Sequence, residues 1–363
     1  MIRFDDVSKT FADGTVAVAN LDLDVEDGET VVLVGPSGCG KTTTLRMINR
    51  LEEASTGRVV VDGRDIAAAD PTALRRGMGY VIQHVGLLPH RTVRDNVATV
   101  PRLLGWPRER VHERVSEMLR LMSLDEATAD RYPHQLSGGQ QQRVGVARAL
   151  AADPAILLMD EPFAAVDPIV RARLQREFLE LKRRVNKTIV FVTHDIDEAI
   201  TLGDRIALFR GDGTLAQFAD PIELLSRPAD GFVADMLGRE RTLKRFSLIP
   251  VGRLAAANGP VAAPETAAEA VADNARAGGC GWVAVVDGDG RFLGWCDSTD
   301  LAGCDRAGDR VMAANGTTVA PSDSLRTALD ATLAHAGGLV AVVDSEQRFH
   351  GTLSLEQLAE AGR

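Results

Sequence analysis

The alternation of apolar and polar positions near the start of the chain predicts two half-buried strands. Residues 2–7 and 18–25 alternate in this way, the second with leucine and valine set against aspartate. A period of two places every second side chain on the same face of a sheet. The turn dipeptide Asp13-Gly14 stands between the two segments, so we expect them to pair antiparallel.

Further along, short apolar runs alternate with longer segments in which apolar residues recur at helical spacing. Uniformly apolar runs are typical of parallel strands that are covered on both faces. This rhythm predicts an α/β fold built on a parallel sheet. We expect strands at residues 30–34, 58–62, 78–82, 156–161 and 188–192, helices at residues 43–51, 107–122, 138–152 and 168–184, and irregular structure at residues 84–106.

The last third of the chain contains an internal repeat, in which Val286-Asp287 and Leu301 recur as Val343-Asp344 and Leu358. Such a repeat indicates two copies of one small unit that bury each other's apolar faces. We therefore predict one domain at residues 1–240 and a second at 241–363, with copies at about 250–305 and 306–363. Each copy should contain a helix (269–277; 325–334), two strands (282–286 and 291–296; 339–343 and 348–353) and a closing helix.

The pattern G-x-x-x-x-G-K-T at residues 35–42 stands between an expected strand and an expected helix, which is the context that a phosphate-binding loop requires. Its glycines let backbone N–H groups converge on an anion, and the following helix adds its positive end. Lys41 is then expected to reach the β- and γ-phosphates, and Thr42 to ligate Mg²⁺. The residues expected to hold the nucleotide here are Gly35, Pro36, Ser37, Gly38, Cys39, Gly40, Lys41, Thr42 and Thr43.

Other candidate residues stand at the ends of expected elements. The strand at 156–161 ends in Asp160 and Glu161, a Mg²⁺ partner and a residue placed to polarise the attacking water. Gln83 and His194 also end strands, although a histidine in that place is often structural. A candidate second anion site lies at the start of an expected helix, formed by Ser137, Gly138, Gly139 and Gln140. Phe11 could stack on a base or only pack.

Composition narrows the class of protein. Every apolar run is far shorter than a membrane-spanning helix requires, and no secretion signal is recognisable at Met1. The net charge of −10 is shared equally by the parts before and after Leu243, which argues against a nucleic-acid partner. The four cysteines show no C-x-x-C spacing, consistent with a reducing cytosol. Cys39, beside a helix N-terminus, is expected to be reactive.

Over about residues 1–240 the chain resembles the ATP-binding cassette (ABC) ATPase family. The resemblance rests on five elements that stand in the family's order: residues 35–42, Gln83, residues 136–143, residues 156–161 and His194. The resemblance implies a P-loop domain with an antiparallel β subdomain and a helical subdomain, and cofactors ATP and Mg²⁺. It also implies a homodimer in which the Ser137 and Gly139 of one cassette complete the ATP site of the other. On this template Gln83 senses Mg²⁺, Glu161 is the general base, His194 contacts the γ-phosphate, and Asp167 belongs to the D-loop.

Details beyond these motifs resemble the glycine betaine/carnitine/choline importers, including residues 80–90, Val100-Pro101 and the glutamines at 140–142. That resemblance implies a peripheral subunit on the cytoplasmic face of the inner membrane. Its partners would be two transmembrane permease subunits, docked on residues 84–106, and through them a substrate-binding protein. The alternatives are a soluble ABC ATPase of translation or DNA repair, an importer ATPase for another small solute, and a nucleotide sensor with a vestigial cassette.

The repeat resembles a tandem CBS (cystathionine-β-synthase type) pair, an α+β module. Many such pairs bind adenine nucleotides through a Ser or Thr and an Asp three residues later. The corresponding positions here are Asp297 and Asp300, then Ser354 and Gln357. Since neither motif is complete, two roles stay open: binding of an adenine (di)nucleotide such as cyclic di-AMP, and structural dimerisation. The basic residues at 239–245 are either a solvated linker or a contact for anionic lipid.

Overall fold

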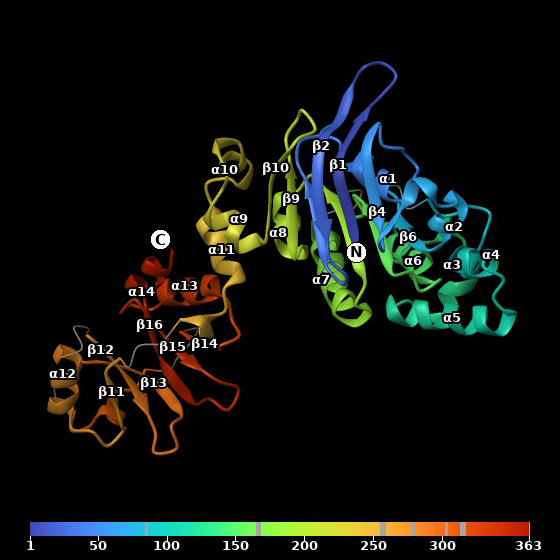
Figure 1. Ribbon diagram of the computed structural model, residues 1–363. Helices are drawn as coiled ribbons and strands as arrows, with labels where there is room; N and C mark the ends of the chain where they lie inside the picture. The colour runs from blue at the N-terminus through green and yellow to red at the C-terminus, as the bar shows by residue number, and fades with distance from the viewer. Residues whose placement is uncertain are drawn as a thin grey trace. The chain divides into compact units, whose positions relative to one another are not determined.

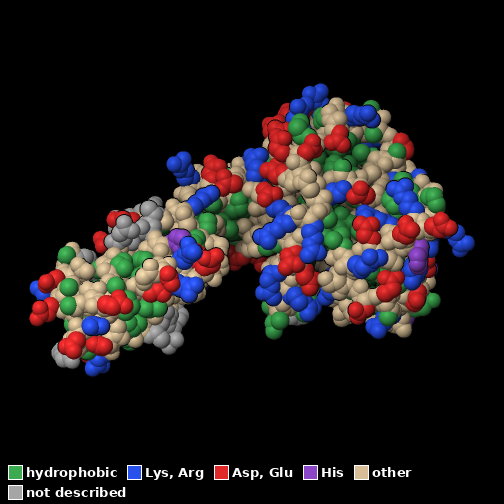
Figure 2. Space-filling model, turned by 90° about the horizontal axis from the view of Figure 1, so that it is seen from below, with side chains coloured by type: hydrophobic (Ala, Val, Ile, Leu, Met, Phe, Trp, Pro, Cys, Tyr) green, Lys and Arg blue, Asp and Glu red, His purple; other side chains and the backbone are tan. Residues whose placement is uncertain are grey.

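A computed structural model describes residues 1–83, 86–164, 168–254, 259–277, 281–301, 304–312 and 317–362. The chain divides into two compact units, Met1–Gly238 and Arg239–Arg363. In the part of the chain that the structure describes, no helix has the length and apolar character of a membrane span. Acidic and basic side chains are interspersed over the face shown in Figure 2.

The first unit is built on a six-stranded sheet with the order β10-β9-β3-β8-β7-β6. Its strands run parallel except β10, which pairs antiparallel with β9. All residues of β3, β7 and β8 are buried, which explains why their sequences are continuous runs rather than alternations. The strands are β3 (Thr30–Val34), β6 (Met78–Val81), β7 (Ile156–Asp160), β8 (Thr188–Thr193), β9 (Arg205–Phe209) and β10 (Leu215–Ala219).

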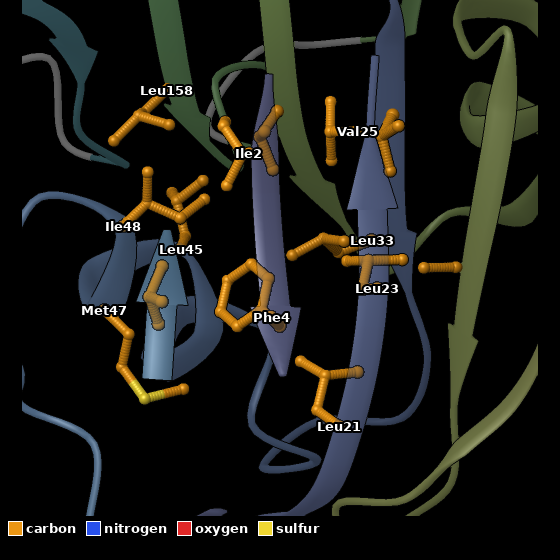
Figure 3. Close-up of a cluster of buried hydrophobic side chains, with 14 of the residues drawn as sticks. Ile2, Phe4, Leu21, Leu23, Val25, Leu33, Leu45, Met47, Ile48 and Leu158 are labelled. Atoms are coloured by element: carbon orange, nitrogen blue, oxygen red, sulfur yellow. The ribbon is translucent and has the colours of Figure 1, made fainter. Parts of the chain in front are cut away.

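A second sheet, with the order β2-β1-β4-β5, confirms the expected antiparallel pair. Its strands are β1 (Ile2–Thr10), β2 (Val16–Val25), β4 (Thr56–Val61) and β5 (Arg64–Asp65). Phe4 lies opposite Leu23 in the β1–β2 register, and both point to the buried face. Figure 3 shows these two side chains packed with Leu33 of β3 and Leu45 of the helix that follows it, so one core joins both sheets.

Helices complete the first unit, and α3 to α6 gather at one end of it (Figure 1). Residues 93–103 form two short helices, so the expectation of irregular structure throughout 84–106 is wrong for this part; His84 and Val85 lie outside the described residues. Thr92 caps the first of these helices with its side chain. The helices are α1 (Lys41–Ile48), α2 (Pro71–Arg76), α3 (Val93–Val97), α4 (Thr99–Leu103), α5 (Arg108–Leu121), α6 (Gly138–Leu150), α7 (Pro168–Val185), α8 (Ile196–Leu202), α9 (Pro221–Ser226) and α10 (Gly231–Leu237), with single-turn 3₁₀ segments η1 (Ile66–Ala68), η2 (Glu126–Asp130) and η3 (Pro133–Gln135).

The second unit contains two three-stranded sheets that repeat one another. Trp282 pairs with Asp297 in the first and Leu339 with Ser354 in the second, and these pairs stand at the same offset as the sequence repeat. Two short parallel strands, β11 and β14, add an edge that the sequence did not predict. The elements are α11 (Arg241–Leu248), η4 (Val251–Arg253), β11 (Val261–Ala262), α12 (Ala268–Ala277), β12 (Trp282–Val286), β13 (Phe292–Asp297), η5 (Ala307–Arg310), β14 (Thr318–Val319), α13 (Leu325–Ala334), β15 (Leu339–Val343), β16 (Phe349–Ser354) and α14 (Leu355–Ala361).

Two expectations for this unit are wrong. The described residues between β13 and η5 contain no helix, so the closing helix expected for the first copy is not found among them. The basic segment is not a solvated linker, because residues 241–248 form α11 and its Phe246 is buried in the core of the second copy. Arg245 also donates to the carbonyl oxygen of Ala361 at 2.8 Å.

The two copies meet in an aromatic cluster. Phe292 stacks on Phe349 with ring centroids 5.8 Å apart. The His335 ring of the second copy lies close to two indoles of the first, 4.6 Å from Trp282 and 4.7 Å from Trp295. His335 Nδ1 accepts from the Gly337 N–H at 3.2 Å, while its buried Nε2 has no hydrogen-bond partner among the described residues. The cluster therefore holds the imidazole in its neutral form.

This packing predicts that the second unit loses stability in acid. Burial lowers the pKa of His335 from its ordinary 6.5, so its contribution is complete above that pH and is lost as the pH falls below it. In the variant His335→Asn the amide oxygen can still accept from the Gly337 N–H, but the side chain does not titrate. In a Trp106→Phe background only Trp282 and Trp295 report by fluorescence.

In the Trp106→Phe chain we expect the urea concentration at the unfolding midpoint to decrease when the pH is lowered from 7.5 to 5.5. The decrease should be smaller when His335→Asn is added. Equal decreases in the two chains would contradict the assignment of the pH dependence to His335.

Candidate functional site

Four neighbouring strands carry the predicted site residues to one edge of the parallel sheet. Residues 35–42 follow β3, and Gln83 follows β6. Asp160 ends β7 and Glu161 comes next, while His194 follows β8. The carboxyl ends of parallel strands lie at the same edge, where α/β sheets bind ligands. The sheet order thus brings together residues that are far apart in the sequence.

The loop after β3 is curled tightly around a lysine. Gly40 has a φ of +89°, and a Cβ there would lie 2.0 Å from the carbonyl oxygen of Ala17, so this position requires glycine. Lys41 is buried, and its Nζ donates to the carbonyl oxygens of Gly35 at 2.8 Å and Pro36 at 2.7 Å. The loop therefore already surrounds a positive charge.

Thr42 and Asp160 are in direct contact. The Thr42 hydroxyl donates to Oδ1 of Asp160 at 2.9 Å. Burial raises the pKa of the Asp160 carboxyl, and the neighbouring Glu161 charge adds to this, against the Thr42 hydrogen bond. Tyr80 and Arg46 also lie near this carboxylate: burial raises the pKa of the Tyr80 hydroxyl, the Asp160 charge adds to this, and Arg46 acts against it. No sequence motif identified Tyr80 or Arg46 as part of the site.

The Glu161 carboxylate joins two other predicted residues. Its Oε2 accepts from Gln83 Nε2 at 3.2 Å and lies 3.2 Å from His194 Nδ1. The Glu161 side chain is 19% exposed and that of His194 is 59% exposed, so the pair borders solvent. Glu161 has a φ of +42°, a left-handed conformation that costs about 1–3 kcal/mol in a non-glycine residue. Its N–H donates to the carbonyl oxygen of Val192 at 3.0 Å, which holds it there.

These residues fit a phosphate group with Mg²⁺. No side chain of the described residues caps the start of α1, so its first N–H groups can serve the loop as anion donors. Thr42 and Asp160, with the Gln83 amide, offer hard oxygen ligands of the kind that Mg²⁺ prefers. Among the described residues no cluster of three or more His, Cys, Asp or Glu could hold a metal ion.

Residues 137–140 belong to a different part of the unit. Ser137 caps α6: it accepts from the Gln140 N–H at 3.3 Å and its own N–H donates to the Gln140 side chain at 3.0 Å. Ser137 and Gly138 are exposed, and the position of a Cβ on Gly138 faces open space. No hydrogen bond or ion pair among the described residues links this cap to the loop after β3. Phe11 is 38% exposed beneath Lys9, and Asp167 lies outside the described residues.

Comparisons with known proteins identify the family. A family model described as ABC transporter matches residues 18–164, and one described as CBS domain matches residues 307–363. The chain is 41% identical over 371 aligned positions to the osmoprotectant import ATP-binding protein OsmV of Salmonella typhimurium, an alignment that covers 99% of this chain and 96% of the relative. The chain belongs to the ABC transporter family of ATP-binding proteins. The expected ABC-type P-loop fold is therefore confirmed.

Other matches cover a smaller share of the chain. The glycine betaine/carnitine/choline transport ATP-binding protein OpuCA of Bacillus subtilis is 53% identical over 244 residues. This alignment covers 67% of this chain, which spans only 64% of that relative's length. A solved dimeric structure of MJ0796, a bacterial ABC transporter cassette, is 35% identical with a TM-score of 0.55, covering 61% of this chain and 99% of that one.

The CBS-type unit of this ABC protein uses its motif positions for local structure. Ser354 and Gln357 form a reciprocal cap at the start of α14, with hydrogen bonds of 2.9 and 3.2 Å. In the first copy Asp297 accepts from the Thr299 hydroxyl at 2.7 Å. Asp300 pairs with Arg310 at 3.4 Å. These contacts are what helix capping and surface ion pairing require, whether or not a ligand binds.

The phosphate loop of this ABC cassette contradicts one expectation. Cys39 is only 1% exposed, and burial raises the pKa of its thiol in spite of the nearby Lys41. The argument from a helix N-terminus neglected the loss of solvation, which disfavours the thiolate. Cys39 is therefore expected to be unreactive rather than reactive.

We predict that maleimide leaves Cys39 unmodified in the native chain at pH 7.5 and labels it after unfolding in guanidinium, because the native thiol is both protonated and inaccessible. Mass spectrometry of the tryptic peptides measures labelling at Cys39 separately, because the peptide of residues 10–41 contains no other cysteine. The unfolded chain is the control for peptide recovery. Rapid labelling of Cys39 in the native chain would contradict the burial described above.

Proposed function

We propose that this chain is the ATP-hydrolysing subunit of an ABC importer. The observation that carries the proposal is the contact of the Glu161 carboxylate with both Gln83 and His194. A carboxylate held beside a phosphate loop by an amide and an imidazole is suited to position and deprotonate a water molecule. The neighbouring Thr42–Asp160 pair supports the same reading, since it lies where the nucleotide's cation would bind.

Each residue of the edge then has a role. Lys41 exchanges the carbonyl oxygens of its own loop for phosphate oxygens, and the α1 N–H groups hold the same anion. Thr42, Asp160 and Gln83 would hold Mg²⁺, which when bound neutralises charge on the phosphates. Glu161 takes a proton from the attacking water, and His194 holds Glu161 on one side while reaching the γ-phosphate on the other. The left-handed backbone at Glu161 aims its carboxylate across the edge.

The exposed α6 cap favours a second cassette as partner. Ser137 and Gly138 present a helix N-terminus to solvent, away from their own loop, so they can close on the nucleotide of another copy. The solved MJ0796 cassette, which this chain resembles, is dimeric. We therefore propose a homodimer with two shared ATP sites, in which Gly139, Gln140 and Asp167 also contribute.

The substrate class and the membrane partners are inferred from relatives and from one surface. OsmV and OpuCA are named for osmoprotectant and glycine betaine/carnitine/choline transport, which supports quaternary amines as the solute. Leu103 and Leu104 are 56% and 42% exposed and stand just before Trp106. Trp106 borders a cavity of about 570 Å³ that is lined also by polar side chains such as Arg102 and His112. The exposed leucines next to it in the sequence are suited to contact a permease segment.

In this proposal the chain sits on the cytoplasmic face of the inner membrane under two permease subunits, which connect it to a substrate-binding protein. Nucleic acid is not a partner, since neither part of the chain is basic. A soluble ABC ATPase and an importer for another solute are the alternatives that reconstitution would separate. The CBS-type unit is proposed to bias the cassettes between separated and closed states.

Replacing Glu161 by Gln tests the hydrolytic role. The amide keeps the size of the side chain but cannot take a proton, so we expect ATP binding to persist while turnover falls by about 100-fold or more. Size-exclusion chromatography with ATP should then show an accumulated dimer. The exposed Glu180→Gln variant removes one charge elsewhere on the unit and should match the wild type. Wild-type turnover in Glu161→Gln would refute the assignment.

Truncation after Gly238 tests the tail. That residue ends the first compact unit, which contains every candidate ATP-site residue, so we expect the truncated chain to hydrolyse ATP. In the reconstituted transporter the truncation should abolish the response to ionic strength or to cyclic di-AMP. Calorimetry of the full-length chain with cyclic di-AMP distinguishes these two stimuli. Full regulation in the truncated transporter would leave the tail a structural dimerisation module.

A further inference from the structure

The two neighbours of His194 are fixed by one hydrogen-bond network. The Asp195 N–H donates to the Thr193 hydroxyl oxygen at 3.0 Å, across the histidine between them. Thr193 is only 2% exposed and ends β8. The Asp195 carboxylate caps α8, accepting from the N–H groups of Asp197 and Glu198 at 2.9 and 3.2 Å. The backbone on both sides of His194 is therefore constrained, although the imidazole itself is exposed.

Glu198 lies behind this turn and anchors it. It is an acidic residue only 6% exposed, on the first turn of α8. Gln175 Nε2 of α7 donates to its Oε1 at 3.0 Å. Burial raises the pKa of this carboxyl, while the nearby Thr193 hydroxyl acts to lower it. Burying a carboxyl group costs free energy unless it is hydrogen-bonded. The presence of an acidic residue at this buried position therefore calls for a reason.

A second contact ties the same two elements together. Arg171, one helical turn before Gln175 on α7, has its Nη1 4.0 Å from Oδ2 of Asp195. Helix α7 thus meets the turn at two points, at Asp195, which caps α8, and at Glu198 on the first turn of α8. From Glu198 the contacts run through Thr193 and the backbone of His194 to the Glu161 carboxylate, 3.2 Å from His194 Nδ1.

We propose that Glu198 is a positioning residue for ATP hydrolysis: hydrogen-bonded through its side chain to Gln175 of α7 and through its backbone N–H to Asp195, it holds His194 against Glu161. The inference rests on the proposed function. Glu198 itself is buried behind the turn and touches neither Glu161 nor His194 by a hydrogen bond among the described residues. Its effect must therefore pass through His194.

The chemistry of the network predicts how substitutions act. The carboxyl accepts from Gln175 and can also accept from the neighbouring Thr193 hydroxyl, whereas the amide of Glu198→Gln accepts with its oxygen and donates with its nitrogen. The Thr193 hydroxyl oxygen would then accept from both the new amide and Asp195, leaving its own hydrogen unpaired. A small shift of the turn follows, and misplacing a catalytic group by about 1 Å can cost up to about 100-fold in rate. Substrate binding at the phosphate loop should be unaffected.

A double-mutant cycle on the full-length chain tests this. Steady-state ATP hydrolysis is measured for the wild type, Glu198→Gln, His194→Ala and the double variant. We expect Glu198→Gln to lower kcat about tenfold with an unchanged KM for ATP, and to have no further effect in the His194→Ala background. Gln175→Ala, which removes the other end of the bridge, should give the same pattern without placing a new group in the core.

Asp197→Asn is the matched control, because it removes one carboxylate from the same turn of α8 at an exposed position. It should retain wild-type kcat. Losses for Glu198→Gln and His194→Ala that multiply in the double variant would overturn the inference, as would a raised KM with unchanged kcat. If Glu198→Gln fails to fold, Gln175→Ala in the same cycle decides the question. An inactive wild type would instead refute the proposed function itself and this inference with it.

Discussion

The parallel register of β6, β7, β8 and β3 is the constraint on which the site depends. In that register Val81 pairs with Met159, Asp160 with Val192, and Val34 with Thr193, so all four strands end almost level with one another. Because side chains alternate along a strand, a slip of one position in β7 would turn its final carboxylate to the opposite face. The buried apolar residues of these strands resist such a slip, and the core thereby sets the alignment of polar groups outside it.

The arrangement at this edge is costly without a ligand. Asp160 is buried beside a second carboxylate, and its raised pKa reflects a charged form that the protein solvates poorly. Lys41 satisfies its ammonium with carbonyl oxygens of its own loop, and Glu161 adopts a left-handed backbone. The charges of Asp160 and Lys41 are both met by groups that a nucleotide and its cation supply. The site is therefore organised in advance for a polyanion with a divalent cation, which lowers the reorganisation needed at binding.

The sequence predicted most of the sheet, since β3 and β7 are uninterrupted apolar runs, and the internal repeat predicted the paired sheets of the tail. It predicted neither β9 nor β10 of the six-stranded sheet. It also missed β11 and β14, because a very short strand defined by a distant parallel neighbour carries no local signal. It missed Tyr80 and Glu198 for a different reason: each is a single polar residue inside an otherwise ordinary element, and only the fold shows what it contacts. The error at Cys39 arose because burial outweighs a helix dipole, and burial is not readable from a loop sequence.

The tail shows how two copies of one unit can become inequivalent. When the copies are aligned by the repeat, Trp282 and Trp295 of the first correspond to Leu339 and Thr352 of the second, so only the first contributes indoles to the shared cluster. His335 is correspondingly held on one side of that cluster alone. A ligand or ionic condition that acts on this unit therefore meets two different half-sites rather than a symmetric pair. Regulation requires a difference in binding free energy between two states, and an asymmetric core allows the two copies to respond separately.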